Sequence, residues 1–215
     1  DLRRRLSMSI ENDSARQVNI IISGIGGQGN VRSAQILGAA AVKAGLRARI
    51  SDVFGIAQRG GPVLSHVRIG SEIYGSMVSS HGADVVVGLE PMEALRGVAQ
   101  FLRPGGTAII SMRPVPPVEV NIGKASYPDM DALLRTIRKA ASKIITLDAT
   151  KIAEDVGIPI AANIVMLGVL AGSGLLPFDS KILIESIKEN IPRSLEQNLK
   201  AFDAGFAIGK GEQGR

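Results

Sequence analysis

Gly24-Ile25-Gly26-Gly27-Gln28-Gly29 follows an apolar run, Val18 to Ser23, and precedes a stretch, Asn30 to Ala44, whose apolar residues recur three or four positions apart. A continuous apolar run that ends in glycine is typical of a buried parallel strand, and the spacing after it predicts an amphipathic helix. The glycines fit a G-x-G-x-x-G spacing, which lets the backbone turn tightly and lets amides at a helix start face an anion. The segment therefore predicts a strand, an anion-binding loop and a helix.

The rest of the chain predicts further strands and helices. The predicted strands are residues 46–53, 63–69, 73–78, 83–88, 107–111 and 143–147. The predicted helices are residues 91–102, 131–141 and 150–156, and from residue 161 onward helices alone, at 161–171, 179–190 and 192–208. The strands at 63–69 and 73–78 flank Gly70-Ser71 and predict a β-hairpin, which adds antiparallel strands to the sheet.

This order predicts an α/β fold, a three-layer Rossmann-like mixed sheet with an antiparallel hairpin and C-terminal helices. We expect one domain over residues 17–209, preceded by a flexible segment, 1–16, and followed by a flexible tail, 210–215.

Composition narrows the functional classes. The 215 residues are 45% hydrophobic, enough for one sizeable core. The net charge is only +5 and the one dense basic run is Arg3 to Arg5, so nucleic-acid binding is not expected. No uncharged apolar run is long enough to span a bilayer and no signal peptide is evident, which favours a cytoplasmic location. The absence of cysteine excludes disulfides, a cysteine nucleophile and cysteine-ligated clusters on this chain.

A dinucleotide site is one interpretation of the glycine loop. Asp52 follows the loop by about 20 residues, where a ribose-binding carboxylate belongs in a dinucleotide fold. A stand-alone NAD-binding protein is therefore an alternative function, but the chain lacks a convincing acid–base set for hydride transfer. His66 lies within a strand pattern and predicts a hydrogen-bonded structural role, whereas His81 lies in a loop. Glu90 precedes Pro91, where either a ligand site or a helix N-terminus accounts for an acid.

An ordered series of short motifs runs through the chain. It comprises Gly24 to Gly29, Phe54 to Pro62 (FGIAQRGGP), Ser65 to Gly70 (SHVRIG), Ala83 to Val85 (ADV), Asn163 to Gly168 (NIVMLG) and Asn198 to Gly205 (NLKAFDAG). From about residue 18 to residue 209, this series closely resembles the gamma domain of 2-oxoacid:ferredoxin oxidoreductases. In length the chain most resembles the small (beta) subunit of the indolepyruvate enzymes, the alternative being the gamma subunit of a pyruvate or branched-chain ketoacid enzyme.

The resemblance implies a subunit of a complex that decarboxylates indolepyruvate or another 2-oxo acid oxidatively to its acyl-CoA and passes electrons to ferredoxin. It further implies that a large partner subunit carries thiamine diphosphate, magnesium and 4Fe-4S clusters, with CoA as co-substrate. No catalytic residue and no metal ligand is expected on this chain, and in isolation it is expected to be inactive.

The candidate site residues fall into two groups. An anion-binding or CoA-side loop is predicted at Gly24, Gly26, Gly27, Gln28 and Gly29, the alternative being a purely structural turn. An interface or composite site is predicted at Gln58, Arg59, Gly60, Gly61 and Asn163. Within that group, Arg59 is predicted to make a cross-subunit or substrate-side ion pair, the alternative being a solvated surface arginine, and Asn163 alternatively caps its helix.

Overall fold

The computed structural model describes residues 17–55 and 60–213. Its strands are β1 Val18–Ile25, β2 Arg47–Phe54, β3 Pro62–Gly70, β4 Ala83–Gly88, β5 Leu102–Ser111 and β6 Lys143–Leu147. Its helices are α2 Asn30–Lys43, α3 Pro91–Phe101, α4 Val118–Asn121, α5 Met130–Ala140, α6 Ala149–Asp155, η1 Pro159–Ala161, α7 Ala162–Gly172, α8 Ser180–Asn190 and α9 Leu195–Gly211. The predicted residues 83–88 and 143–147 match β4 and β6, and residues after 161 contribute helices alone to the described fold, as predicted.

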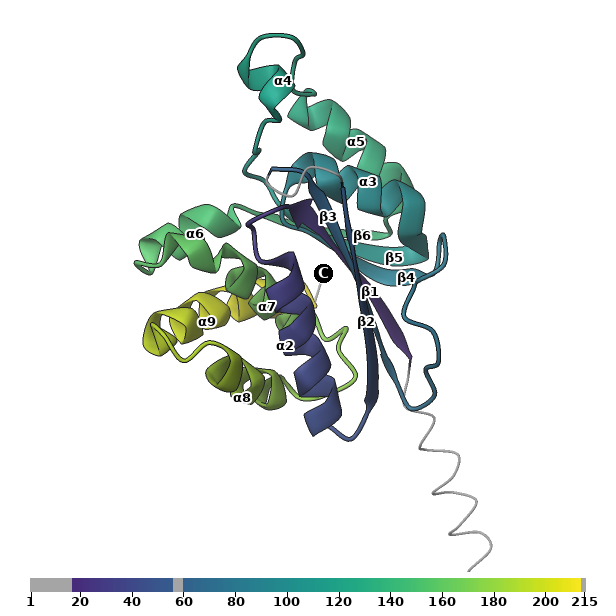
Figure 1. The fold of residues 1–215 in the computed structure, drawn as a ribbon, viewed down its shortest axis with the longest axis vertical. Helices are drawn as coiled ribbons and strands as arrows, with labels where there is room; N and C mark the ends of the chain where they lie inside the picture. The colour runs from purple at the N-terminus through teal and green to yellow at the C-terminus, as the bar shows by residue number, and fades with distance from the viewer. Residues whose placement is uncertain (1–16, 56–59, 214–215) are drawn as a thin grey trace, which may run out of the picture.

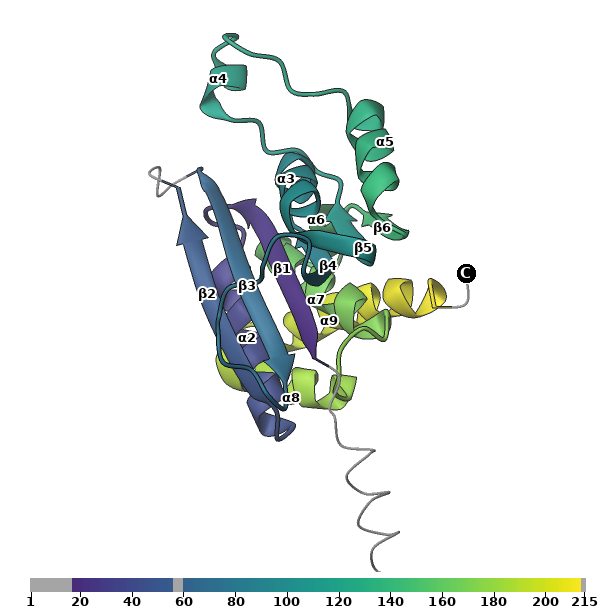
Figure 2. The ribbon, with the colours of Figure 1, turned by 90° about the vertical axis from the view of Figure 1, so that its right-hand side faces the viewer.

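The six strands form one mixed sheet in the order β2-β3-β1-β4-β5-β6. β3 runs antiparallel to both of its neighbours, β1 and β2, whereas β1, β4, β5 and β6 pair in parallel. Helices lie on both faces: α2, α7, α8 and α9 on one side and α3 and α5 on the other (Figures 1 and 2). The predicted three-layer mixed sheet is therefore confirmed.

The hairpin is formed by strands other than the predicted ones. β3 pairs with β2, which precedes it in the chain, and residues 73–78 form no strand. Both edges of β3 are already occupied by β1 and β2, so a following strand has no free edge to join. Ile73 and Val78 belong to the loop that crosses from β3 to β4, and their apolar side chains are buried. The predicted strand at 73–78, and with it the predicted hairpin partner of 63–69, is therefore wrong.

Two helices meet along paired glycines. A Cβ atom on Gly168 of α7 would lie 2.1 Å from the carbonyl oxygen of Phe202, and one on Gly205 of α9 would lie 2.0 Å from that of Val165. Gly172 and Gly209 make the same kind of approach, each at 2.2 Å from a backbone oxygen of the facing helix. The helices therefore touch backbone to backbone, and any side chain at these positions would separate them. α7 is buried along nearly its whole length, and α9 covers one of its sides.

Residues 112–129, here called the arm, leave the sheet after β5 and return at α5. The arm carries the short helix α4, which was not predicted, and projects beyond the sheet (Figures 1 and 2). Within the described ranges, none of the helices is long and apolar enough to cross a membrane.

Candidate functional site

The glycine loop turns between the carboxyl end of β1 and the start of α2. Gly27 and Gly29 have φ angles of 101° and 90°, in the left-handed region that favours glycine. The Gln28 side chain closes the turn: its Oε1 accepts a hydrogen bond from the Ile25 amide at 2.8 Å and its Nε2 donates to the Leu89 carbonyl at 3.2 Å. Gln28 therefore holds the loop in shape and ties it to the end of β4.

The start of α2 is suited to an anion. Its N-cap residue, Gly29, has no side chain, and neither a side-chain cap nor an acidic first-turn residue occurs in the described helix. The first amides of a helix and its dipole attract negative charge, and here no side chain of the cap competes for them. The start of α2 therefore offers uncapped amides beside the glycine loop, and anion binding there stays a prediction.

The second glycine turn lies against the first. The Gly26 amide donates to the Gly61 carbonyl at 2.9 Å, and Gly60 has a φ angle of 72°. The structure thereby brings together two segments that the sequence separates by about thirty residues. Gln58 and Arg59, predicted for the same site, lie outside the described residues.

Asn163 reaches the loop from the other side but does not cap α7. The N-cap of α7 is Ala161, and the Asn163 side chain instead donates through Nδ2 to the Ser33 hydroxyl of α2 at 3.2 Å. A Cβ atom on Gly29 would lie 2.7 Å from the Asn163 Nδ2 atom. The capping alternative is therefore wrong: Asn163 joins α7 to α2 and occupies the space that glycine leaves free at residue 29.

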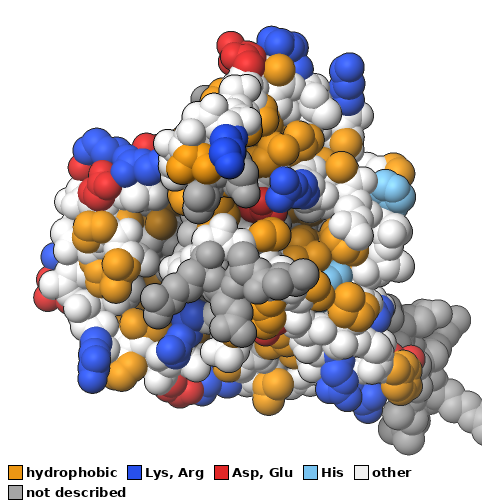
Figure 3. All heavy atoms as spheres, turned by 45° about the horizontal axis from the view of Figure 1, so that its top comes forward, with side chains coloured by type: hydrophobic (Ala, Val, Ile, Leu, Met, Phe, Trp, Pro, Cys, Tyr) orange, Lys and Arg blue, Asp and Glu red, His pale blue; other side chains and the backbone are white. Residues whose placement is uncertain are grey.

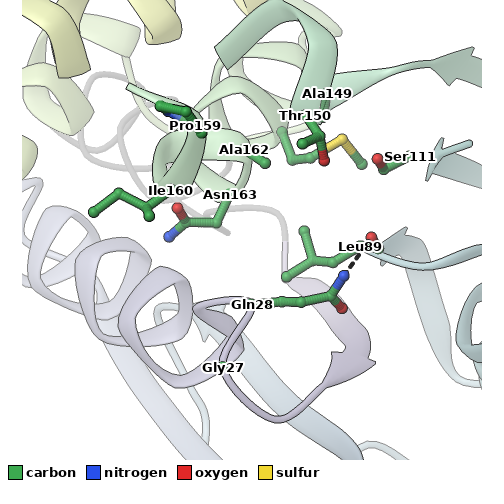
Figure 4. A pocket seen from close by; sticks show the side chains of 11 residues that line it. Gly27, Gln28, Leu89, Ser111, Ala149, Thr150, Pro159, Ile160, Ala162 and Asn163 are labelled. Atoms are coloured by element: carbon green, nitrogen blue, oxygen red, sulfur yellow. Dashed lines mark hydrogen bonds between the residues drawn. The ribbon is translucent and has the colours of Figure 1, made fainter. Parts of the chain in front are cut away.

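Two adjoining cavities open beside the loop. The smaller, about 190 Å³, lies between the loop and the start of α7, where Gln28 faces it from one wall and Asn163 and Pro159 from the other (Figure 4). The larger, about 610 Å³, extends to the residues before α9 and includes Arg32 and Arg193. The N-terminal ends of α2, α7 and α9 all border it, and its described lining contains no aspartate or glutamate. Helix termini and arginines together favour a negatively charged occupant.

The sheet order argues against a dinucleotide site. β3 separates β1 from β2, so Asp52 lies one strand away from the strand that carries the loop. Its carboxylate accepts a hydrogen bond from the Ser65 hydroxyl of β3. A ribose-binding carboxylate belongs on a strand adjacent to the loop's strand, so Asp52 does not stand in that position.

The two histidines have structural surroundings. His66 is fully buried, its Nδ1 accepts a hydrogen bond from the Val78 amide at 3.1 Å, and its ring meets that of Phe101 edge to face at 5.1 Å. This contact confirms the predicted hydrogen-bonded role. His81 is exposed, with a φ angle of 53° and its Nδ1 3.3 Å from the Leu102 carbonyl oxygen.

His66 should make stability depend on pH. Burial lowers its pKa below the ordinary 6.5, with the charge of Asp52 opposing. Below about pH 6.5 the histidine is protonated in the unfolded chain but stays neutral in the folded one. The free energy of unfolding therefore decreases as the pH is lowered, by at most about 1.4 kcal/mol per pH unit. The variant H66N keeps an acceptor for Val78 but has no imidazole. Urea unfolding at about pH 7.5 and about pH 5.5 measures this loss. The free energy of unfolding should decrease less in H66N than in the parent chain, whereas in H81N it should decrease as much as in the parent chain.

A buried acid lies directly beside the loop. Glu90 is 1% exposed and caps α3, with Oε2 accepting from the Glu93 amide at 2.9 Å, so the helix-terminus explanation is confirmed. Its Oε1 accepts from the Tyr127 hydroxyl and from the Val115 amide, both in the arm. Burial raises the pKa of Glu93, and burial followed by the hydrogen bond to Glu90 raises that of Tyr127.

Several residues around the site had no signal in the sequence. Tyr127 follows an irregular stretch, Arg193 lies between two helices, and Ser111 and Thr150 end or begin ordinary elements. Ser111 and Thr150 line the smaller cavity, Arg193 lines the larger one, and Tyr127 contacts Glu90, so each reaches the site through contacts that are distant in the sequence.

Comparison with known proteins agrees with the motif series. The family model described as pyruvate ferredoxin/flavodoxin oxidoreductase matches residues 19–208. Indolepyruvate oxidoreductase subunit IorB of Pyrococcus horikoshii is 38% identical over 91% of this chain and 97% of its own length. The pyruvate/ketoisovalerate oxidoreductases common subunit gamma of Thermococcus kodakarensis is 32% identical over 88% of this chain and 95% of its own length.

Solved structures share the fold. The gamma subunit of keto/oxoacid ferredoxin oxidoreductase from Geobacter sulfurreducens superposes with a TM-score of 0.66 at 24% identity, covering 90% of this chain and 99% of that one. The 2-oxoglutarate:ferredoxin oxidoreductase of Magnetococcus marinus, with 2-oxoglutarate, coenzyme A and succinyl-CoA bound, gives a TM-score of 0.68 at 21% identity over 91% of this chain and 31% of that one. Family model, curated relatives and fold thus agree over nearly the whole chain, which belongs to the pyruvate ferredoxin/flavodoxin oxidoreductase family.

Proposed function

We propose that this chain is the small subunit of a ferredoxin-dependent oxidoreductase that acts on indolepyruvate or another aryl 2-oxo acid. The observation that carries the proposal is the 38% identity to an indolepyruvate oxidoreductase subunit over 97% of that relative's length. Identity to the pyruvate/ketoisovalerate gamma subunit is lower, at 32%, so a pyruvate or branched-chain enzyme is the second candidate.

The reaction divides between this chain and a partner. A 2-oxo acid and CoA give an acyl-CoA and carbon dioxide, while two electrons pass to ferredoxin. We assign thiamine diphosphate, magnesium and 4Fe-4S clusters to a larger partner subunit, because this chain has no cysteine and its described residues offer no cluster of three metal-ligating side chains. The Magnetococcus chain, of which a unit like this one makes up only 31%, supports a larger assembly around this fold.

In this assembly the glycine loop is suited to lie next to a negatively charged group. Gly24 to Gly29, the uncapped start of α2 and the arginines Arg32 and Arg193 give the cavities the electrostatics that CoA phosphates need. The loop itself binds and orients, and it carries no group that could act as an acid or base. We propose that the loop faces the CoA phosphates at the junction with the partner.

Apolar side chains around the loop support a shared surface. Ile160 is 87% exposed beside both cavities, Phe54 is 58% exposed next to the second glycine turn, and Ile122 is 57% exposed on the arm. Figure 3 shows apolar side chains gathered along and below the arm on this face. Large exposed apolar groups around a polar loop are typical of a protein interface.

The proposed cross-subunit role of Arg59 gives a test. In a pull-down with the tagged chain, R59A should weaken capture of the partner by about tenfold, because a desolvated ion pair loses one member. Arg49, an exposed arginine of β2, provides the matched control R49A. If R59A leaves assembly and turnover as they are in R49A, Arg59 has no such role.

A further inference from the structure

Glu90 does more than cap a helix. An N-cap needs one acceptor within short reach, and aspartate, asparagine, serine or threonine normally supplies it. Glu90 is longer than that task requires, and only its Oε2 is used for the cap. Among the described residues, its Oε1 is engaged only by the arm, through the Val115 amide at 3.4 Å and the Tyr127 hydroxyl. The extra methylene therefore lets one carboxylate reach two structures.

The two arm contacts come from opposite ends of the arm. Val115 lies just after β5, on the outgoing leg, and Tyr127 lies just before α5, on the returning leg. One buried oxygen thus joins both legs at their base. No salt bridge to Glu90 occurs among the described residues, so its buried carboxylate is held by these donors and by the α3 N-terminus. Loss of the arm contacts would leave this oxygen unsatisfied.

The same turn also holds the glycine loop. Leu89, the neighbour of Glu90, donates its amide to the Ser23 carbonyl at 2.8 Å and accepts from Gln28 Nε2 at 3.2 Å. Adjacent residues therefore anchor the loop on one side and the arm on the other. The distance between loop and arm is set at this single turn.

We propose that Glu90 is a positioning residue that holds the arm in a fixed place relative to the glycine loop, so that the partner subunit meets both as one surface. The proposal rests on the proposed function for the identity of that partner. It assigns Tyr127 as the contact through which Glu90 acts, and it gives Glu90 no contact with substrate.

The two tyrosines provide a direct spectroscopic test. The chain has no tryptophan, and its tyrosines are Tyr74, which is 78% exposed, and Tyr127. In a Y74F background the fluorescence therefore reports Tyr127 alone. A carboxylate that accepts from a phenol quenches its emission, so adding E90D should raise the emission at least about twofold, since aspartate keeps the cap and falls short of Tyr127. Unchanged emission would show that the contact does not exist in solution.

Hydrogen exchange and capture test the positioning itself. E90D and Y127F should each speed amide exchange in residues 114–128 by about tenfold, with β4 unchanged, and should weaken partner capture by a similar factor. The control Y74F should alter neither. The proposal would be overturned if amide exchange in residues 114–128 were unchanged in both variants. It would also be overturned if exchange there became faster while the chain still captured its partner as well as the parent does. Failure of the unsubstituted chain to capture any partner would instead contradict the proposed function.

Discussion

Replacing Gly205 by alanine should destabilise the protein by about 3 kcal/mol and lower its melting temperature by about 10 °C. The added Cβ atom would lie 2.0 Å from the Val165 carbonyl oxygen, which belongs to helix backbone and cannot rotate away. α9 must then move off α7, which displaces Asn198 of α9 in the lining of the larger cavity. Thermal unfolding followed by circular dichroism measures the effect.

Gly211 provides the control on the same helix. A Cβ atom there would meet no heavy atom within 4 Å, so G211A should be neutral or slightly stabilising. If G205A melts within about 2 °C of G211A, the close backbone approach of α7 and α9 is not the packing of the folded protein.

Among substitutions of single loop glycines by alanine, G29A should disturb the glycine loop most. Gly29 has a φ angle of 90°, and the new Cβ atom would lie 2.7 Å from Asn163 Nδ2. Backbone strain and the displaced amide together should cost about 2 to 3 kcal/mol. In the assembled complex we expect the KM for CoA to rise at least about tenfold, because the start of α2 no longer holds its position. Steady-state kinetics with varied CoA measures this.

The variant G27A is the control that separates backbone strain from the steric clash with Asn163. The φ angle of Gly27 is 101°, yet a Cβ atom there has no neighbour within 4 Å, so G27A carries the strain alone and should cost about 1 kcal/mol. Shortening the neighbour, in the double variant G29A/N163A, should restore part of the CoA affinity. Equal effects of G27A and G29A would mean that Asn163 does not pack on the loop.

The local pattern around the loop was predictable because each feature there has a short-range cause. The apolar run of β1, the glycine turn and the helical spacing of α2 all lie within Val18–Lys43, and the structure places them as expected. Strand order was not predictable in the same way. Asp52 does lie near the carboxyl end of β2, but nothing local revealed that β3 inserts between β2 and β1.

The remaining errors also come from long-range contacts. Residues 73–78 were predicted as the second strand of a hairpin, but Ile73 and Val78 are buried from a loop that crosses the sheet. Asn163 lies at the start of an apolar helix, where a cap is a common role, but its partner is Ser33 in α2, far away in the sequence. Tyr127 gave no signal because its hydrogen-bond partner, Glu90, belongs to a distant segment of the chain.

Affinity capture of the tagged chain from its native cell extract tests the central claim most directly. The eluate is assayed for thiamine, for iron and for dye reduction that depends on a 2-oxo acid and CoA. The account predicts a large partner that carries thiamine and iron–sulfur clusters, with the dye reduced faster in the presence of indolepyruvate than of pyruvate or branched 2-oxo acids. A chain recovered alone that binds NAD would contradict the account and would return Gly24 to Gly29 to a dinucleotide site.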